Sequence, residues 1–156
     1  MNNAPVAFVP FIAIGAFAGL RTAETERLAW QDVDLSGVFI EVKAAKAKTR
    51  SRRLVPITTN LVQWVRPYAR PKGNVFEGNV SNARVETAKA AGIRWKHNGL
   101  RHSFCSYRLA QIQNAAQVAL EAGNSPTMVF RHYRELVKPE QAKAWFSITP
   151  SNTKRN

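Results

Sequence analysis

A tyrosine and an arginine in this sequence stand in segments that together suit phosphate chemistry. Arg101 lies in the opening turn of a predicted amphipathic helix, and Tyr133 follows farther along the chain among Arg131, His132 and Arg134. A tyrosine hydroxyl is a poor nucleophile at neutral pH because its ordinary pKa is about 10. Cations that favour the phenolate and hold an anionic substrate would activate it, and arginine can bind two phosphate oxygens at once. The first hypothesis is therefore phosphoryl transfer to a protein tyrosine.

The chain is strongly basic, with 23 lysines and arginines against 10 acidic residues and a formal net charge of +13. Such an excess favours a polyanionic partner, most simply nucleic acid, although a ribosomal or architectural protein without a catalytic site would carry it too. No acidic residue stands between Glu41 and Glu77. That interval holds the cations Lys43, Lys46, Lys48, Arg50, Arg52, Arg53, Arg66, Arg70 and Lys72. This concentration has the distribution of an electrostatic footprint for nucleic acid.

Two features bear on the cellular compartment. Cys105 is the only cysteine, so no internal disulfide is possible, which fits a reducing compartment. The uncharged run 4–20 is too short to span a bilayer and contains Pro5 and Pro10, and no lysine or arginine precedes it. We therefore expect a buried core helix and a cytoplasmic, nucleoid-associated protein. The histidines and the cysteine lack the spacing of zinc ligands, so no metal or other cofactor is expected.

Glycines, prolines and apolar periodicity divide the 156 residues into one domain of helices and two strands. The predicted helices are 6–17, 22–30, 59–68, 82–91, 100–110 and 114–122, with two more opened by Pro126 and Pro139. The predicted strands are 38–42 and 54–57, and Pro56 indicates an edge position for the latter. The predicted fold class is α+β, mostly helical with a small antiparallel β-sheet.

Four motifs occur along the chain in a fixed order. They are Gly19-Leu20-Arg21-Thr22-Ala23-Glu24, Lys46-Ala47-Lys48-Thr49, Leu100-Arg101-His102-Ser103-Phe104, and Ala122-Gly123-Asn124 followed by Tyr133. Each motif alone is weak evidence for a protein family, but the four together in this order are strong evidence. In this order the motifs resemble those of the tyrosine recombinases, the phage-type integrases, and the resemblance covers about residues 6–148. It implies a DNA breaking-rejoining catalytic domain over residues 1–148, followed by a flexible tail, 149–156.

The resemblance implies a reaction and a set of catalytic residues. Tyr133 would attack a DNA phosphodiester, giving a 3′-phosphotyrosyl intermediate and a free 5′-hydroxyl, and attack by a 5′-hydroxyl would rejoin the strand. Neither ATP nor a metal is required, because the ester keeps the energy of the bond. Arg21 and Arg101 would stabilise charge on the phosphate oxygens. Lys48 would protonate the leaving oxygen as general acid, with Lys46 as its rival.

Two asparagines depart from the family pattern. Asn98 stands where the second motif usually has histidine, and Asn124 where the family has histidine or tryptophan. Both are placed in the predicted catalytic set, since asparagine can donate a hydrogen bond to phosphate, although it moves no proton at neutral pH. Asn98 is also a candidate N-cap for the helix that carries Arg101. We expect a working enzyme; the alternative is a DNA-binding relative that has lost catalysis.

Other candidates surround this set. The predicted DNA-binding residues are Lys46, Arg50, Arg52, Arg53, His102 and His132. His102 lies about 100° around the helix from Arg101 and is equally expected to pack behind the site or to take part in catalysis. His132 would assist proton transfer at Tyr133 or be merely exposed. Tyr107 and Tyr68 are alternative nucleophiles, on another helix face and in a packing position respectively.

The remaining expectations concern partners. The partner is double-stranded DNA, and the apolar tail 135–148 would either pack on its own domain or dock on a neighbouring protomer, coupling active sites in a DNA-bound tetramer. The family's upstream core-binding domain is expected to be absent, because nothing of that kind precedes residue 6. Without that clamp, DNA binding should be weak and salt-sensitive. A type IB topoisomerase, which relaxes supercoils by the same chemistry, is a further rival.

Overall fold

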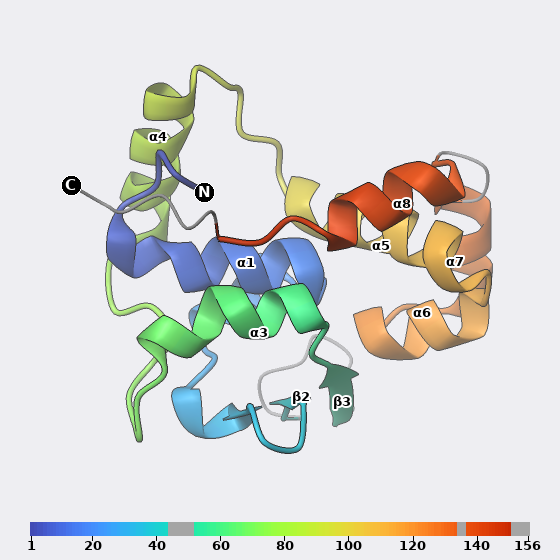
Figure 1. The fold of residues 1–156 in the computed structure, drawn as a ribbon, viewed down its shortest axis with the longest axis horizontal. Coiled ribbons are helices and arrows are strands. Elements are labelled where there is room, and N and C mark those ends of the chain that lie inside the picture. The colour runs from blue at the N-terminus through green and yellow to red at the C-terminus, as the bar shows by residue number, and fades with distance from the viewer. Residues whose placement is uncertain (44–51, 134–136, 151–156) are drawn as a thin grey trace.

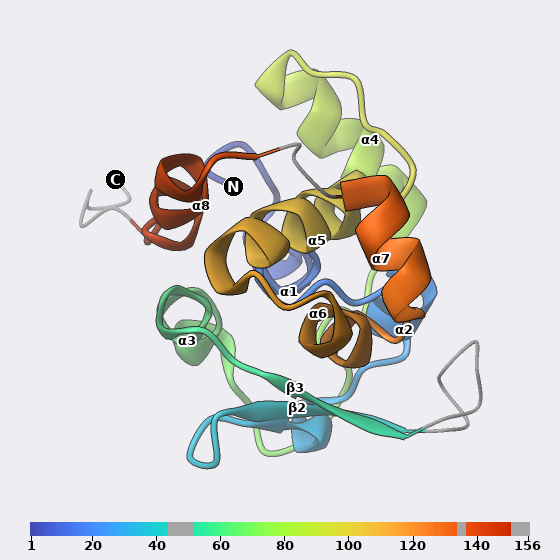
Figure 2. The same cartoon turned by 90° about the vertical axis from the view of Figure 1, so that its right-hand side faces the viewer.

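The computed structural model describes residues 1–43, 52–133 and 137–150, and within these ranges the chain is mostly helical with one small sheet (Figure 1). Helix α1 (Val9–Phe17) follows a 3₁₀ turn (Val6–Phe8), and all nine of its residues are buried. Pro10 lies in its first turn, where a missing N–H costs no helical hydrogen bond. Figure 2 shows α1 nearly end-on, enclosed by other helices. The apolar run predicted as a core helix is therefore confirmed as one. Among the described residues, no helix is both long and apolar enough to cross a membrane.

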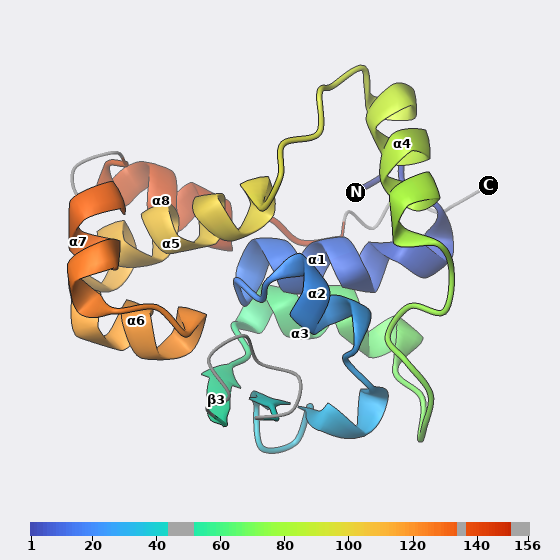
Figure 3. The same cartoon turned by 180° about the vertical axis from the view of Figure 1, so that it is seen from behind.

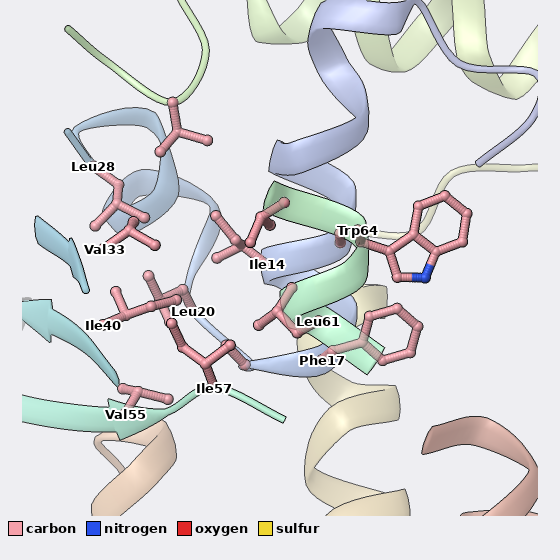
Figure 4. Close-up of a cluster of buried hydrophobic side chains, with 14 of the residues drawn as sticks. Ile14, Phe17, Leu20, Leu28, Val33, Ile40, Val55, Ile57, Leu61 and Trp64 are labelled. Atoms are coloured by element: carbon pink, nitrogen blue, oxygen red, sulfur yellow. The ribbon is translucent and has the colours of Figure 1, made fainter. Parts of the chain in front are cut away.

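The sheet is antiparallel, with strand order β1-β2-β3. Its strands are β1 (Val33–Asp34), β2 (Phe39–Val42) and β3 (Arg53–Pro56). The register pairs Ile40 with both Val33 and Val55, whose side chains are buried against the helices. Pro56 lies on an edge strand, as predicted, because β3 ends the sheet. Figure 4 shows these strand side chains near Leu20 and Ile57, on one side of the larger core, with Trp64 and Phe17 on the other.

The predicted helix 22–30 is wrong in its extent. Helix α2 (Thr22–Glu26) is one short element, and a separate 3₁₀ turn covers Trp30–Asp32. The cause is tertiary: the backbone of Leu28 accepts from the N–H of Val75, and the N–H of Trp30 donates to the carbonyl of Gly73. Arg21, not Thr22, occupies the N-cap position of α2. The N-cap position fixes the direction in which the Arg21 side chain leaves the backbone.

The other helices follow the sequence pattern closely. They are α3 (Thr59–Val65) with a 3₁₀ turn (Arg66–Tyr68), α4 (Val80–Ala91), α5 (Gly99–Ile112), α6 (Ala115–Ala122), α7 (Pro126–Tyr133) and α8 (Pro139–Phe146). Pro67 accounts for the 3₁₀ ending of the predicted helix 59–68. Figure 3 shows α5, α6 and α7 gathered at one end of the molecule, with α2 nearer its centre. A second hydrophobic cluster forms beneath them and includes Phe104, Val118 and Tyr133.

The described part of the C-terminal segment packs on its own chain. Helix α8 lies against α5, and the indole N–H of Trp145 donates to the carbonyl of Ala16 at 3.2 Å. Beyond the helix, the carbonyl of Ile148 accepts hydrogen bonds from Trp64 and Asn60. Of the two expected arrangements, this structure adopts packing within the domain. Most of the predicted flexible tail, 149–156, lies outside the described residues.

Candidate active site

Arg21 is fixed by its place at the start of α2. Its backbone N–H and its Nη1 both donate to the carboxylate of Glu24, each at 2.9 Å, so one acid orients both the chain and the side chain. Its Nη2 donates to the carbonyl of Gly123 at 2.6 Å, at the C-terminal end of α6. The guanidinium group therefore crosses from α2 to the turn between α6 and α7.

Arg101 comes from the first turn of α5 and is only 6% exposed. Its Nη1 donates to the carbonyl of Gly19 at 2.7 Å. Gly19 has φ +66°, and a Cβ at this position would overlap the Phe104 ring, so glycine permits both the turn and the close approach of α5. Burial, together with the positive charge of Arg21, lowers the pKa of Arg101 below its ordinary value. Two like charges thus lie close together in a poorly hydrated place.

Asn124 joins these two arginines. Its Oδ1 accepts from Nη2 of Arg101 at 2.9 Å and from Nη2 of Arg21 at 3.2 Å. Guanidinium groups only donate, so the amide oxygen must be the atom that faces them. Gly123 ends α6 in the left-handed conformation, and the N–H of Asn124 bonds back to Ala119, which holds the asparagine in place. The structure therefore brings Arg21, Arg101 and Asn124 together around one oxygen atom.

Asn98 occupies the expected N-cap position but does not cap the helix with its side chain. It stands at the N-cap of α5 with φ +52°, and its side chain makes no capping hydrogen bond. The left-handed backbone instead turns Oδ1 toward the hydroxyl of Thr22, which donates to it at 3.3 Å. The predicted side-chain cap is therefore wrong. In this structure Asn98 links the starts of α2 and α5.

Tyr133 is the last residue of α7 and is 8% exposed. Its hydroxyl lies 2.8 Å from Nδ1 of His102 on α5. Burial raises the pKa of the Tyr133 phenol above its ordinary value of 10, and the nearby Cys105 adds to this; the charge of Arg101 works in the opposite direction without reversing it. The expectation that neighbouring cations favour the phenolate is therefore wrong for this arrangement, because desolvation outweighs them.

The alternative tyrosines have packing roles. Tyr107 stacks on Trp145, with ring centroids 4.4 Å apart and an interplanar angle of 5°. Tyr68 lies in the 3₁₀ turn after α3 and packs against the larger core. Both rings are thus accounted for by the fold.

The basic residues predicted to bind DNA divide into three groups. Lys46 and Arg50 lie outside the described residues, as does Lys48, the predicted general acid. Arg52 is 68% exposed and pairs with Glu41 at 2.8 Å. Arg53 is 10% exposed: it donates twice to Glu24 and, through Nε, once to the carbonyl of Glu121. The burial of Arg53 and its three hydrogen bonds within the protein argue against the expected DNA contact.

The two histidines predicted to bind DNA, His102 and His132, differ in their surroundings. His102 was expected among the DNA-binding residues, but here its Nδ1 faces the Tyr133 hydroxyl. His132 is exposed, and its ring centroid lies 6.4 Å from that of Tyr133. Among the described residues, no group of three or more potential metal ligands is present.

Sequence reasoning missed the central role of Glu24. It is 2% exposed and binds both Arg21 and Arg53, so it joins α2 to strand β3. Burial alone would raise the pKa of Glu24, but hydrogen bonds from Arg53 and from the Arg21 backbone, with both positive charges, hold it below its ordinary value of 4.5. The signal available in the sequence was the three-residue spacing from Arg21, which is that of a capping box.

Comparison with known proteins agrees with this architecture. The sequence model of the phage integrase family matches residues 10–138. The tyrosine recombinase XerC of Xanthomonas campestris pv. campestris (strain B100) is 29% identical over 149 residues, which cover 85% of this chain and 45% of that protein. The chain thus spans about half the length of the curated relatives it matches.

Solved structures share the fold at low sequence identity. The XerA recombinase superposes with a TM-score of 0.69 at 19% identity, covering 90% of this chain and 57% of that one. The catalytic domain of bacteriophage HP1 integrase gives 0.63 at 20%, covering 94% and 84%. The Tn1549 transposon integrase, in complex with a circular intermediate DNA, gives 0.59 at 18%, covering 89% and 60%. Because the family model matches most of its length, this chain belongs to the phage integrase family.

Proposed function

We propose that this chain is the catalytic part of a site-specific DNA recombinase or integrase that cleaves and rejoins strands through a 3′-phosphotyrosyl intermediate. The observation that carries the proposal is the convergence of Arg21 and Arg101 on a single oxygen, at 3.2 and 2.9 Å. Two forked cations directed at one acceptor form a site for an oxyanion. Tyr133 reaches the same helix, α5, one residue beyond Arg101.

The arginines would act on the scissile phosphate. Its non-bridging oxygens would take the place that the amide oxygen of Asn124 has beside the two Nη2 atoms. Charge that develops on those oxygens as Tyr133 attacks would meet two donors already fixed by Glu24, Gly123 and Gly19. Donors held in advance stabilise the transition state without reorganising, and burial of Arg101 strengthens the effect.

The covalent step is balanced within the protein and the DNA. The O–H bond of Tyr133 breaks and its proton passes to a base, the phenol oxygen bonds to phosphorus, and the bond to the 5′-oxygen breaks as Lys48 gives that oxygen a proton. The ester retains the energy of the phosphodiester, so the reaction proceeds without ATP or a metal. Asn124 and Asn98 contribute hydrogen bonds and no proton transfer, because an amide does not titrate near neutral pH.

Double-stranded DNA is the proposed partner, which the net charge of +13 supports. We place this activity in the cytoplasm, at the nucleoid. Self-association of protomers into a tetramer on DNA would use the C-terminal segment. Since α8 is held here by Ala16 and by the packing on α5, its exchange between protomers would first require release of these contacts.

A nicked duplex that traps the covalent intermediate tests this function. The wild-type protein should form an adduct that resists denaturation, and Tyr133→Phe should bind the DNA without forming it. Tyr107→Phe is the matched control, because it removes a hydroxyl from a ring that stacks on Trp145 and should leave adduct formation intact. Absence of the adduct where wild-type protein demonstrably binds the duplex would contradict the proposal.

A DNA-binding relative without catalysis is the second candidate. It is favoured by the two asparagines, which stand where the family usually has histidine (Asn98) and histidine or tryptophan (Asn124), and by the burial of Tyr133. The same experiment separates the two functions, since this candidate predicts binding of the duplex by wild-type protein and no adduct.

A further inference from the structure

We infer that His102 is the base that removes the proton from the Tyr133 hydroxyl during strand cleavage and returns it during rejoining. This inference rests on the proposed function and adds a catalytic residue to it. Among the residues that the structure describes, His102 provides the one nitrogen base within hydrogen-bonding distance of that hydroxyl, at 2.8 Å from Nδ1. The two rings meet at 46°, with centroids 5.7 Å apart.

The direction of this hydrogen bond follows from the surroundings of the phenol. Burial raises the pKa of Tyr133, so the hydroxyl keeps its proton at neutral pH and acts as the donor. Nδ1 must then be the acceptor, which assigns the remaining proton of the neutral imidazole to Nε2. A neutral imidazole in this tautomer is ready to receive the phenol proton. The same burial explains why a base is needed, because phenolate is scarce before the attack.

The neighbouring ionisable groups offer no equivalent base. Cys105, on the same face of α5, also contacts the phenol, but burial raises the pKa of its thiol and keeps it neutral. Arg101 is a cation and accepts nothing. On α7, His132 is exposed and its ring lies farther from Tyr133 than that of His102.

The other helices packed against α5 carry groups that are exposed or already paired. Helix α1 contains no ionisable side chain. On α6, Glu121 receives two hydrogen bonds from Arg108. On α8, Glu140 and Lys143 are exposed. His102 is therefore the group in position to exchange a proton with Tyr133.

The proton balance closes over both steps. In cleavage the O–H bond of Tyr133 breaks, its proton passes to Nδ1 of His102, and the phenol oxygen bonds to phosphorus as the 5′-oxygen departs with a proton from Lys48. In rejoining, the 5′-hydroxyl gives its proton back to Lys48 as its oxygen bonds to phosphorus, and the imidazolium returns its proton to the phenol oxygen as that oxygen leaves phosphorus. Because the His102 side chain is exposed, it can also exchange protons with solvent between the steps.

Single-turnover cleavage of the nicked duplex, measured across pH, tests this role. His102→Ala and His102→Asn should both slow cleavage by roughly 10²- to 10⁴-fold, the usual range for a general base. Asparagine keeps an acceptor near the position of Nδ1 but cannot take the proton, so it separates holding Tyr133 from deprotonating it. In both variants the rate should keep rising with pH where the wild-type rate is level, since hydroxide must remove the proton. His97→Asn, an exposed histidine before α5, should keep the wild-type rate and profile.

Two results would overturn the inference alone. One is a His102→Asn variant that cleaves at the wild-type rate, which would mean that His102 only positions Tyr133. The other is a nitrogen NMR spectrum of the DNA-free protein in which Nδ1 of neutral His102 carries the proton, or in which Tyr133→Phe leaves the imidazole signals unchanged. Wild-type protein that binds DNA without forming an adduct would instead overturn the proposed function, and the role of His102 with it.

Discussion

At the scale of single residues, the site depends on one amide oxygen. Asn124 supplies an acceptor to both Arg21 and Arg101, and so keeps two neighbouring cations aligned when no DNA is bound. The oxygen is neutral, so a phosphate can replace it readily. The strength of this acceptor therefore decides how readily phosphate can displace it.

Replacing Asn124 by aspartate should increase stability and decrease activity. A carboxylate would add an ion pair to the hydrogen bonds that both guanidinium groups already make at this position, and would compete with phosphate. We expect Asn124→Asp to raise the free energy of unfolding and to abolish adduct formation, as measured by urea denaturation and the nicked duplex.

The control for this substitution is Asn114→Asp at the other end of α6. Asn114 caps the helix by accepting from the N–H of Gln117, and aspartate caps equally well, so the variant adds the same charge and should retain activity. An Asn124→Asp protein that forms adduct as fast as the wild type would contradict the role of the shared oxygen.

At the scale of elements, one buried carboxylate connects three of them. Glu24 on α2 binds Arg21 and Arg53, and Arg53 at the start of β3 also donates to the carbonyl of Glu121 on α6. Strand β3 leads out of the basic connection that contains Lys48. The link therefore ties the start of β3 to the arginine that would bind phosphate.

Replacing Glu24 by glutamine should be strongly destabilising and should change the pH dependence of stability. Removing one partner of a buried pair leaves uncompensated cations and costs about 3–5 kcal/mol at neutral pH. The folded-state pKa of Glu24 is lowered from 4.5, so ionised Glu24 stabilises the fold above pH 4.5. That contribution is lost as the pH falls below 4.5 through the folded-state pKa.

Unfolding free energies measured from neutral pH to below pH 4 check this prediction. Wild-type protein should lose more stability than Glu24→Gln over the acidic part of the range. Glu26→Gln, at an exposed position on the same helix, should resemble the wild type. Parallel curves for the wild type and Glu24→Gln would exclude a lowered pKa for Glu24.

At the scale of the whole molecule, the positive charge divides into structural and available cations. Arg52 and Arg53 are adjacent in sequence, yet one is 68% and the other 10% exposed. Arg53 begins strand β3 and shares a sheet face with the buried Val55, whereas Arg52 lies just before the strand. Charge counting alone therefore overestimates the surface that DNA can contact.

This pair gives a matched test on DNA binding. Arg52→Gln should lower the slope of log K against log salt by about one if the residue contacts phosphate, with little effect on stability. Arg53→Gln should leave the slope unchanged and should cost about 3 kcal/mol of unfolding free energy, because it breaks the buried pair with Glu24. A change in slope for Arg53→Gln without loss of stability would contradict the structural assignment.

Much of the fold could be predicted because local signals mark it. Gly92, Gly123, Pro126 and Pro139 set helix boundaries where they were expected, and the apolar run of α1 is buried as its composition implies. The extent of α2 could not be predicted, since pairing of Leu28 and Trp30 with a distant loop ends the helix. Local propensity carries no information about such a partner.

The motifs of the site could be predicted from the sequence, but not which of their residues contact one another. Helical geometry correctly turned His102 away from Arg101, but only the packing of α7 on α5 places Tyr133 against it. Likewise, the basic character of residues 43–53 concealed the burial of Arg53, which depends on an acid from another element. Contacts between elements decide both roles, and the sequence does not contain them in any local pattern.

The most direct test of the account is the identity of the residue that carries DNA after cleavage. Trypsin should release His132-Tyr133-Arg134 from the adduct, and mass spectrometry of this peptide should find the nucleotide on Tyr133 through its 3′-phosphate. Arg21→Ala and Arg101→Ala should each prevent its formation. A nucleotide attached to Tyr107 or Tyr68, or an adduct that survives loss of both arginines, would contradict the account.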